Sequence, residues 1–233
     1  SNAVQVARGI LGRLDELRRI LPYLLQDARD REDLHAESHL LVHGQAWIDR
    51  IEGRYERGLA NLDRAMAPWR SLGTTLLSVF EGFQRVQLLI AADRLDEALA
   101  FFRALDRRTR WSPLMALDSH RSLRAVTEAL LASALVDERG TRSDRRRLAR
   151  ARRALLSRPH PYTRVQNLAL TSRSADGGRD VEPLLEAERI AAAHGAHLTA
   201  LAARVRAGAP DGEDALRRLG ARYPRQLARS LLA

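Results

Sequence analysis

The sequence contains no cysteine and no lysine, and only 5% of its residues are aromatic. The lack of cysteine excludes disulfide bonds and thiolate chemistry, and it is compatible with a reducing cytoplasm, where we expect the protein to reside. No run of about 18 apolar residues occurs, which is the length that a membrane-spanning helix requires. We therefore predict no membrane span and no membrane partner.

All 39 basic residues are arginines, and the formal net charge is +10. Arginine can bind a carboxylate or a phosphate through two parallel hydrogen bonds, which lysine cannot do. A strongly basic surface favours acidic partners, and nucleic acid is one candidate among them. Leucine and alanine supply most of the apolar residues, and both favour helices.

The first residues do not read as a native start. Ser1, Asn2 and Ala3 resemble the scar that a vector leaves after tag removal, and no initiator methionine follows them. We interpret residues 1–3 as such a scar and residues 4–233 as a single helical-repeat domain of a longer protein. A Gly-, Ser- and Asp-containing stretch at 173–180 marks a sub-boundary within that domain.

Apolar residues recur at helical spacing along most of the chain. In the stretch Arg94–Leu105, for example, Leu95, Ala98 and Phe102 lie on one helix face. No stretch alternates in the way that a strand requires. The pattern predicts an all-α fold of about ten helices, arranged as an α-solenoid of stacked antiparallel helix hairpins.

Two stretches, Glu52–Ala65 and Ala92–Leu105, align with each other without a gap. The alignment pairs Gly53 with Asp93, Tyr55 with Leu95, Gly58 with Ala98, Leu62 with Phe102, and Ala65 with Leu105. This order of a turn, a small residue and a large apolar residue resembles the tetratricopeptide repeat. The two small residues are 40 positions apart, against about 34 in the standard repeat. The resemblance implies over-long first helices and a buried Ala98 at a close helix crossing.

The RLDEA turn, the arginine-rich middle and the late run Leu184–Arg189 resemble the helical C-terminal parts of large bacterial signalling regulators. Those regulators include serine/threonine kinases and LuxR-type ATP-dependent regulators. The resemblance implies a non-catalytic protein–protein interaction or sensor and relay module. Its partner would be a protein, a peptide or another domain of the same parent chain.

Catalytic motifs are missing from the sequence. It has no glycine-rich phosphate loop, no nucleophile elbow and no kinase signature. We therefore expect no enzyme activity, no catalytic residue and no cofactor.

The repeat alignment also predicts which side chains face a partner. Placing Gly53 and Asp93 at equivalent turns puts one set of residues on the concave face of the first helices, namely His43, Trp47, Arg50, Phe83 and Gln87. An aromatic and mostly uncharged groove of this kind suits an extended or helical peptide. The alternative is that these side chains belong to the core.

An arginine cluster follows in the middle of the chain, between residues 139 and 158. Its members include a predicted polyanion patch, namely Arg145, Arg146, Arg147, Arg150 and Arg153. No aromatic residue interrupts the cluster, so we expect weak binding to polyanions without sequence preference. A solvated helix is the alternative. The cluster also supports a second candidate function, a basic helical domain that binds nucleic acid.

Three histidines, His35, His39 and His43, follow one another at four-residue steps. Two histidines at this spacing on a helix can chelate a metal, so a metal-binding helical protein is a third candidate. The motif of zinc proteases is absent and no cysteine can contribute a ligand. A solvated polar stripe is the alternative, and we assign no metal ligands.

Overall fold

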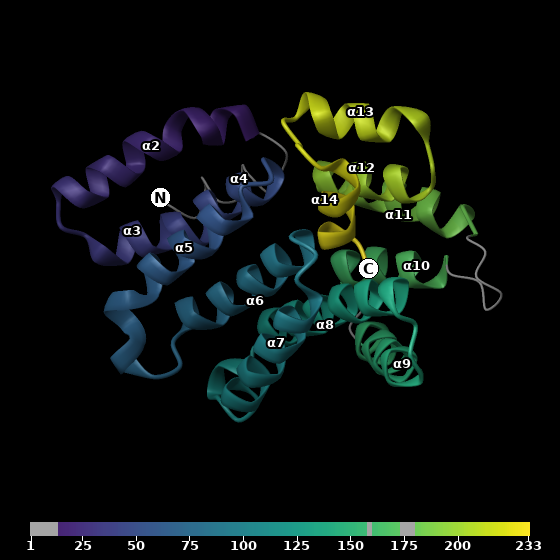
Figure 1. The fold of residues 1–233 in the computed structure, drawn as a ribbon, viewed down its shortest axis with the longest axis horizontal. Helices are drawn as coiled ribbons and strands as arrows, with labels where there is room; N and C mark the ends of the chain where they lie inside the picture. The colour runs from purple at the N-terminus through teal and green to yellow at the C-terminus, as the bar shows by residue number, and fades with distance from the viewer. Residues whose placement is uncertain (1–13, 158–159, 173–179) are drawn as a thin grey trace.

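The computed structural model describes residues 14–157, 160–172 and 180–233, which form helices and no strand (Figure 1). The first half contains α2 (Leu14–Asp30), α3 (Leu34–Leu40), the π turn η1 (Leu41–Gln45), α4 (Ala46–Ile51), α5 (Tyr55–Met66), the short helix η2 (Ala67–Leu72), α6 (Leu76–Ala91) and α7 (Leu95–Thr109). The second half contains the short helix η3 (Pro113–Ala116), α8 (Asp118–Glu138), α9 (Arg142–Leu156), α10 (Pro161–Thr171), α11 (Glu182–Ala193), α12 (His197–Arg206), α13 (Pro210–Arg218) and α14 (Pro224–Leu231). The predicted all-α class is confirmed.

The described residues hold twelve α-helices when α3, η1 and α4 are counted as one continuous helix. This is more than the expected ten. The last four, α11 to α14, are short, with lengths of 12, 10, 9 and 8 residues. The predicted scar at residues 1–3 lies outside the described residues, as does most of the predicted sub-boundary at 173–180. None of the described helices has the length and apolar character needed to cross a bilayer.

Six of the described helices end in the same tight turn. In each, one residue adopts a positive φ, and the amide of the next residue donates to a carbonyl five positions earlier, as in a Schellman cap. The positive-φ residues after α2, α4, α6, α11, α12 and α13 are Glu32, Gly53, Asp93, Gly195, Gly208 and Gly220. The predicted equivalence of Gly53 and Asp93 as turn residues is therefore confirmed, with φ of 67° and 62°.

The small positions of the repeat alignment are buried. Ala98 in α7 is fully enclosed, which confirms its predicted burial. Gly58 in α5 is also buried, and a Cβ at that position would lie 3.1 Å from Leu88 of α6 and 3.2 Å from Asp49 of α4. The absence of a side chain at Gly58 therefore lets α5 approach both neighbouring helices.

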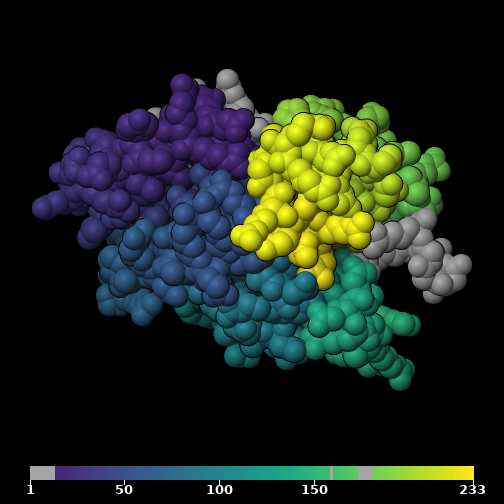
Figure 2. Space-filling view, turned by 45° about the horizontal axis from the view of Figure 1, so that its top comes forward, coloured from purple at the N-terminus to yellow at the C-terminus, as the bar shows by residue number. Residues whose placement is uncertain are grey.

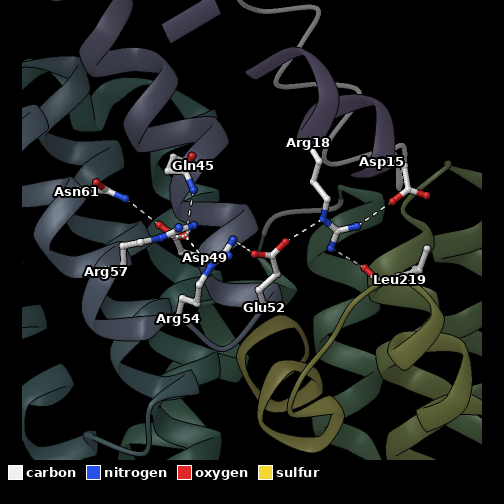
Figure 3. Close-up of polar contacts among 9 residues, drawn as sticks. All are labelled: Asp15, Arg18, Gln45, Asp49, Glu52, Arg54, Arg57, Asn61 and Leu219. Atoms are coloured by element: carbon white, nitrogen blue, oxygen red, sulfur yellow. Dashed lines mark hydrogen bonds and ion pairs between the residues drawn. The ribbon is translucent and has the colours of Figure 1, made fainter. Parts of the chain in front are cut away.

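Asp49 is a fully buried carboxylate at the end of α4 (Figure 3). Gln45 donates to it at 3.0 Å, Arg57 at 2.8 Å and Asn61 at 2.9 Å. Arg54, at the turn, forms an ion pair with the same carboxylate at 3.5 Å. A buried charge is tolerated only when it is paired and hydrogen-bonded, so this network ties α4 to α5.

Packing follows chain order over most of the molecule, but the C-terminal helices return to the first half. Helix α14 contacts α6 and α8 as well as α12, and Figure 2 shows the yellow C-terminal segment seated between the purple and green parts. Arg18 of α2 donates to the Leu219 carbonyl at 2.8 Å and to Glu52 at 3.0 Å (Figure 3). The amide of Arg222 donates to the Ile51 carbonyl at 3.3 Å. The end of the chain is thus fastened to α2 and α4.

Candidate functional site

The predicted groove must be corrected, because the structure encloses three of its five residues. Arg50, Phe83 and Gln87 are only 1%, 2% and 6% exposed, so a partner cannot contact them on this surface. His43 and Trp47 are half-buried. The alternative, that these side chains belong to the interior, holds for Arg50, Phe83 and Gln87.

Arg50 is enclosed by contacts within the protein. Its guanidinium lies 4.2 Å from the centre of the Trp47 ring and donates to the side-chain oxygen of Gln87. Burial lowers the pKa of Arg50 to about 10, and Tyr162 of α10 acts against that lowering. Together with the packing of α14 on α6, these contacts show that the C-terminal helices cover the part of the surface where the groove was predicted.

The π turn η1 supplies a second reason for the correction. A π turn adds one residue to a helix, which rotates the following residues by roughly 100° relative to an uninterrupted helix. His43 lies within η1 and Trp47 lies after it. The two side chains therefore face different neighbours: His43 contacts Phe80 of α6, whereas Trp47 packs against the C-terminal core.

A row of rings runs from α3 and η1 across α6 to α8. The ring centres of His35 and His39 are 4.4 Å apart, and those of His39 and His43 are 5.4 Å apart. His43 meets Phe80 edge-on at 4.9 Å, and Phe80 lies 5.3 Å from His120 of α8. We call these five side chains the aromatic strip. His35 is exposed, the next three are half-buried and His120 is buried.

The imidazoles inside the strip favour the neutral form. Burial lowers the pKa of His43 to about 4, with a smaller contribution from the neighbouring His39. Burial also lowers the pKa of His39, with His35 contributing, and burial alone lowers that of His120. At neutral pH these three rings are therefore uncharged, and the middle of the strip is an uncharged surface on a basic protein.

Exposed leucines lie at the starts of the helices that carry the strip. Leu34 opens α3 and is 54% exposed, Leu76 opens α6 and is 43% exposed, and Leu117 precedes α8 and is 49% exposed. Figure 1 shows that α3, α6 and α8 all begin on the same side of the molecule. We call these three residues the leucine rim. Apolar side chains that gather on the surface of a protein are typical of an interaction surface, and each of these three leaves an apolar side chain exposed.

The three histidines of α3 and η1 lie side by side. Among the described residues, no group of three or more His, Asp or Glu side chains is arranged to hold a metal ion. His35, His39 and His43 do share a helix face, as their spacing predicts, but their rings stack on one another and on Phe80. Metal binding by these histidines stays a prediction from the sequence.

The predicted polyanion patch lies on α9, which packs on α8 and α10 at the outside of the molecule (Figure 1). Arg145, Arg146, Arg150 and Arg153 are exposed. Arg147 is half-buried and forms an ion pair with Glu128 of α8 at 3.5 Å. The structure thus brings four of the five arginines to the surface and turns one toward α8.

Phe80 and His120 were not among the predicted site residues. Phe80 has the same i, i+4 relation to Leu76 that the histidines have to one another, which is a signal that the sequence carries. His120 has no such signal, because its place beside Phe80 depends on how α8 packs against α6. The chain matches no family model, no curated protein and no solved structure.

Proposed function

We propose that the chain is a non-catalytic protein–protein interaction module that binds an uncharged, amphipathic segment of its partner across the aromatic strip. We further propose that its helices form a stack of antiparallel hairpins resembling tetratricopeptide repeats. The recurring Schellman turns and the buried small residues Gly58 and Ala98 support this arrangement. The role as a sensor or relay in a larger cytoplasmic bacterial regulator stays a prediction from the sequence.

The observation that carries the proposal is the aromatic strip itself. Rings from α3, η1, α6 and α8 form one continuous row, although those helices are separated along the chain. His43 lies in a π turn, and such turns often occur at functional sites. A row that crosses successive helices is the arrangement by which stacked helical repeats present an extended surface to a ligand.

The chemistry of the strip indicates the kind of segment that would bind. Neutral imidazoles and a phenylalanine offer flat apolar surface, and the exposed leucines of the leucine rim stand at the starts of the helices that carry it. A segment with leucine and aromatic side chains at helical spacing would bury these groups. A highly charged segment would lose hydration there without gaining a counter-ion.

A peptide-display experiment tests the proposal. A random peptide library is selected on the protein at 150 mM salt, and enriched peptides are measured by fluorescence anisotropy. We expect peptides with leucine and aromatic residues three or four positions apart. We expect Phe80→Ser to weaken their binding at least tenfold, because Phe80 lies between His43 and His120.

Two further variants separate binding from folding. Leu76→Ser removes an exposed rim side chain without disturbing the core and should weaken binding about threefold or more. Leu156→Ser on α9 removes a leucine that is 60% exposed, against 43% for Leu76, outside the strip, and it should leave binding unchanged. Enriched peptides that bind Phe80→Ser and Leu76→Ser as tightly as the wild type would overturn the proposal.

A further inference from the structure

A second surface lies on the solvent-facing sides of α7 and α9. It carries arginines that have no acidic partner. Within the described residues, eight of them form no ion pair with a carboxylate, namely Arg103, Arg107, Arg142, Arg145, Arg146, Arg150, Arg152 and Arg153. Elsewhere arginines are commonly paired, as Arg94 is with Glu97 and Arg217 with Glu213. Among the described residues other arginines without an ion pair occur elsewhere, as at Arg19 and Arg218, but α9 alone carries six of the eight named here.

Part of this surface is a hollow between α7 and α9, with α8 as its floor. It has a volume of about 450 Å³ and contains five arginines against only two carboxylates, those of Asp106 and Glu128. Both carboxylates are already engaged: Arg124 donates to Asp106 at 2.6 Å, and Glu128 pairs with Arg147 at 3.5 Å. The hollow thus keeps excess positive charge. Burial lowers the pKa of Arg147, and repulsion by Arg103 and Arg150 lowers it further.

The outer face of α9 adjoins the hollow, and Arg150 contributes to both. The outer face carries arginines at positions 142, 146, 150 and 153, and the residues between them are Ser143 and Ala149. These arginines span eleven helical steps, or about 16 Å at 1.5 Å per residue. One strand of a duplex carries a phosphate about every 3.4 Å along its axis, so this length faces several phosphates.

We propose that Arg103 and Arg107 of α7 and the arginines of α9 form a binding surface for the phosphate backbone of double-stranded nucleic acid, without sequence preference. This site is separate from the aromatic strip, and its test does not depend on the proposed peptide binding. Arginine suits phosphate because its planar guanidinium donates two parallel hydrogen bonds.

The side chains between the arginines favour a duplex over the two nearest alternatives. An acidic protein segment would need apolar or aromatic anchors to bind stably. Along the stretch lined by Arg142, Arg146, Arg150 and Arg153 the lining residues between the arginines are serine and alanine, and the exposed Leu156 lies beyond its end. A single strand would need exposed aromatic rings for stacking, and the ring that lines the hollow, Phe102, is buried. A duplex backbone requires neither.

The test is fluorescence anisotropy with a labelled 20-base-pair duplex of mixed sequence at 50 to 200 mM salt. We expect binding at 50 mM salt that weakens steeply as salt rises, with a slope of log K against log [salt] of about −3 to −4, as for roughly four phosphate contacts. The triple variant Arg146→Glu, Arg150→Glu, Arg153→Glu should weaken binding at least tenfold and flatten the slope.

A matched control carries the same change in net charge on other helices. Arg19→Glu, Arg64→Glu, Arg70→Glu replaces three exposed arginines of α2, α5 and η2, and should keep most of the binding. Circular dichroism confirms that both triple variants stay folded. The proposal is overturned if the wild type fails to bind at 50 mM salt, if both triples lose binding equally, or if one duplex sequence is strongly preferred. It is also overturned if polyglutamate displaces the duplex at equal charge concentration, which would indicate an acidic protein partner.

Discussion

Arg229 of α14 donates to the carboxylate of Asp93, a residue 136 positions earlier in the turn between α6 and α7. The same guanidinium donates to the Ile90 carbonyl at 3.3 Å. Asp93 also holds a positive φ of 62°, a conformation that costs a residue with a side chain roughly 1 kcal/mol. The turn therefore contains an aspartate where glycine would be less strained, and the carboxylate of that aspartate binds Arg229 of the C-terminal helix α14.

The contact between Arg229 and Asp93 predicts that replacement by glycine changes the free energy of unfolding differently at two equivalent turns, those of Glu32 and Asp93. Glu32 has a positive φ of 54° and its side chain is exposed, so Glu32→Gly should raise the free energy of unfolding by about 0.5–1 kcal/mol. Asp93→Gly relieves the same strain but loses the contact with Arg229, so its net gain should be smaller or negative. Urea unfolding of both variants measures the difference, and an equal gain at both positions would show that the Arg229 contact adds no stability.

Ala98 allows a second prediction, because it is fully buried in α7. Ala98→Leu should overpack the interior and lower the free energy of unfolding by about 1–3 kcal/mol. Ala104 lies on the exposed side of the same helix, so Ala104→Leu is the matched control and should change stability by less than about 0.5 kcal/mol. Thermal unfolding of the two variants tests this prediction. An unchanged melting temperature for Ala98→Leu would contradict the repeat alignment.

The third prediction concerns the buried carboxylate of Asp49, which receives hydrogen bonds from Gln45, Arg57 and Asn61. Asp49→Asn keeps the shape of the side chain but removes the negative charge that these donors surround. It should lower the free energy of unfolding by about 3 kcal/mol. Asp63 also binds an arginine, Arg85, but is mostly exposed, so Asp63→Asn should cost less than about 1 kcal/mol. If both variants lost a similar free energy of unfolding, the burial of Asp49 would not explain its contribution to stability.

The fourth prediction is a loss of stability in acid that depends on His43. Its pKa is about 4 in the folded protein and near 6.5 in the unfolded chain. The unfolded chain therefore binds more protons between these values, and stability should be complete above pH 6.5 and fall as the pH decreases toward 4. The difference corresponds to about 3 kcal/mol at most.

Substitution identifies the titrating ring. His43→Phe keeps an aromatic contact with Phe80 but cannot be protonated, so its stability should depend less on pH over this range. His35→Phe, at the exposed end of the strip, should leave the wild-type dependence in place. Urea midpoints measured from pH 7.5 to 4.5 test this, and identical curves for His43→Phe and the wild type would exclude His43 as the source.

Local features of the fold could be predicted from the sequence because they depend on a few neighbouring residues. The turn residues Gly53 and Asp93 and the buried small position Ala98 follow from a short alignment. The capping box of α9 follows from Thr141 and Asp144, whose side chains each accept a hydrogen bond from the other's backbone amide. Each of these features is determined within one or two helical turns.

The groove residues could not be predicted in the same way. The enclosure of Arg50 and Phe83 depends on how helices from the second half of the chain pack on the first, and no local pattern in the sequence records that contact. The π turn at His43 shifts the register of α4 by one residue, although the surrounding apolar spacing reads as an ordinary helix. The relative directions of the arginines on α9 could be predicted, because all of them lie on one helix and follow its periodicity.

The return of α14 to α6 also has a consequence for how the protein is synthesised. A hairpin can form as soon as its two helices leave the ribosome, because its contacts are local. The contact between Arg229 and Ile90 joins residues 139 positions apart, so it cannot form until α14 has left the ribosome. Until then the face of α6 that α14 covers is open to solvent on the nascent chain, and a chaperone that recognises apolar helices has its longest opportunity to bind there.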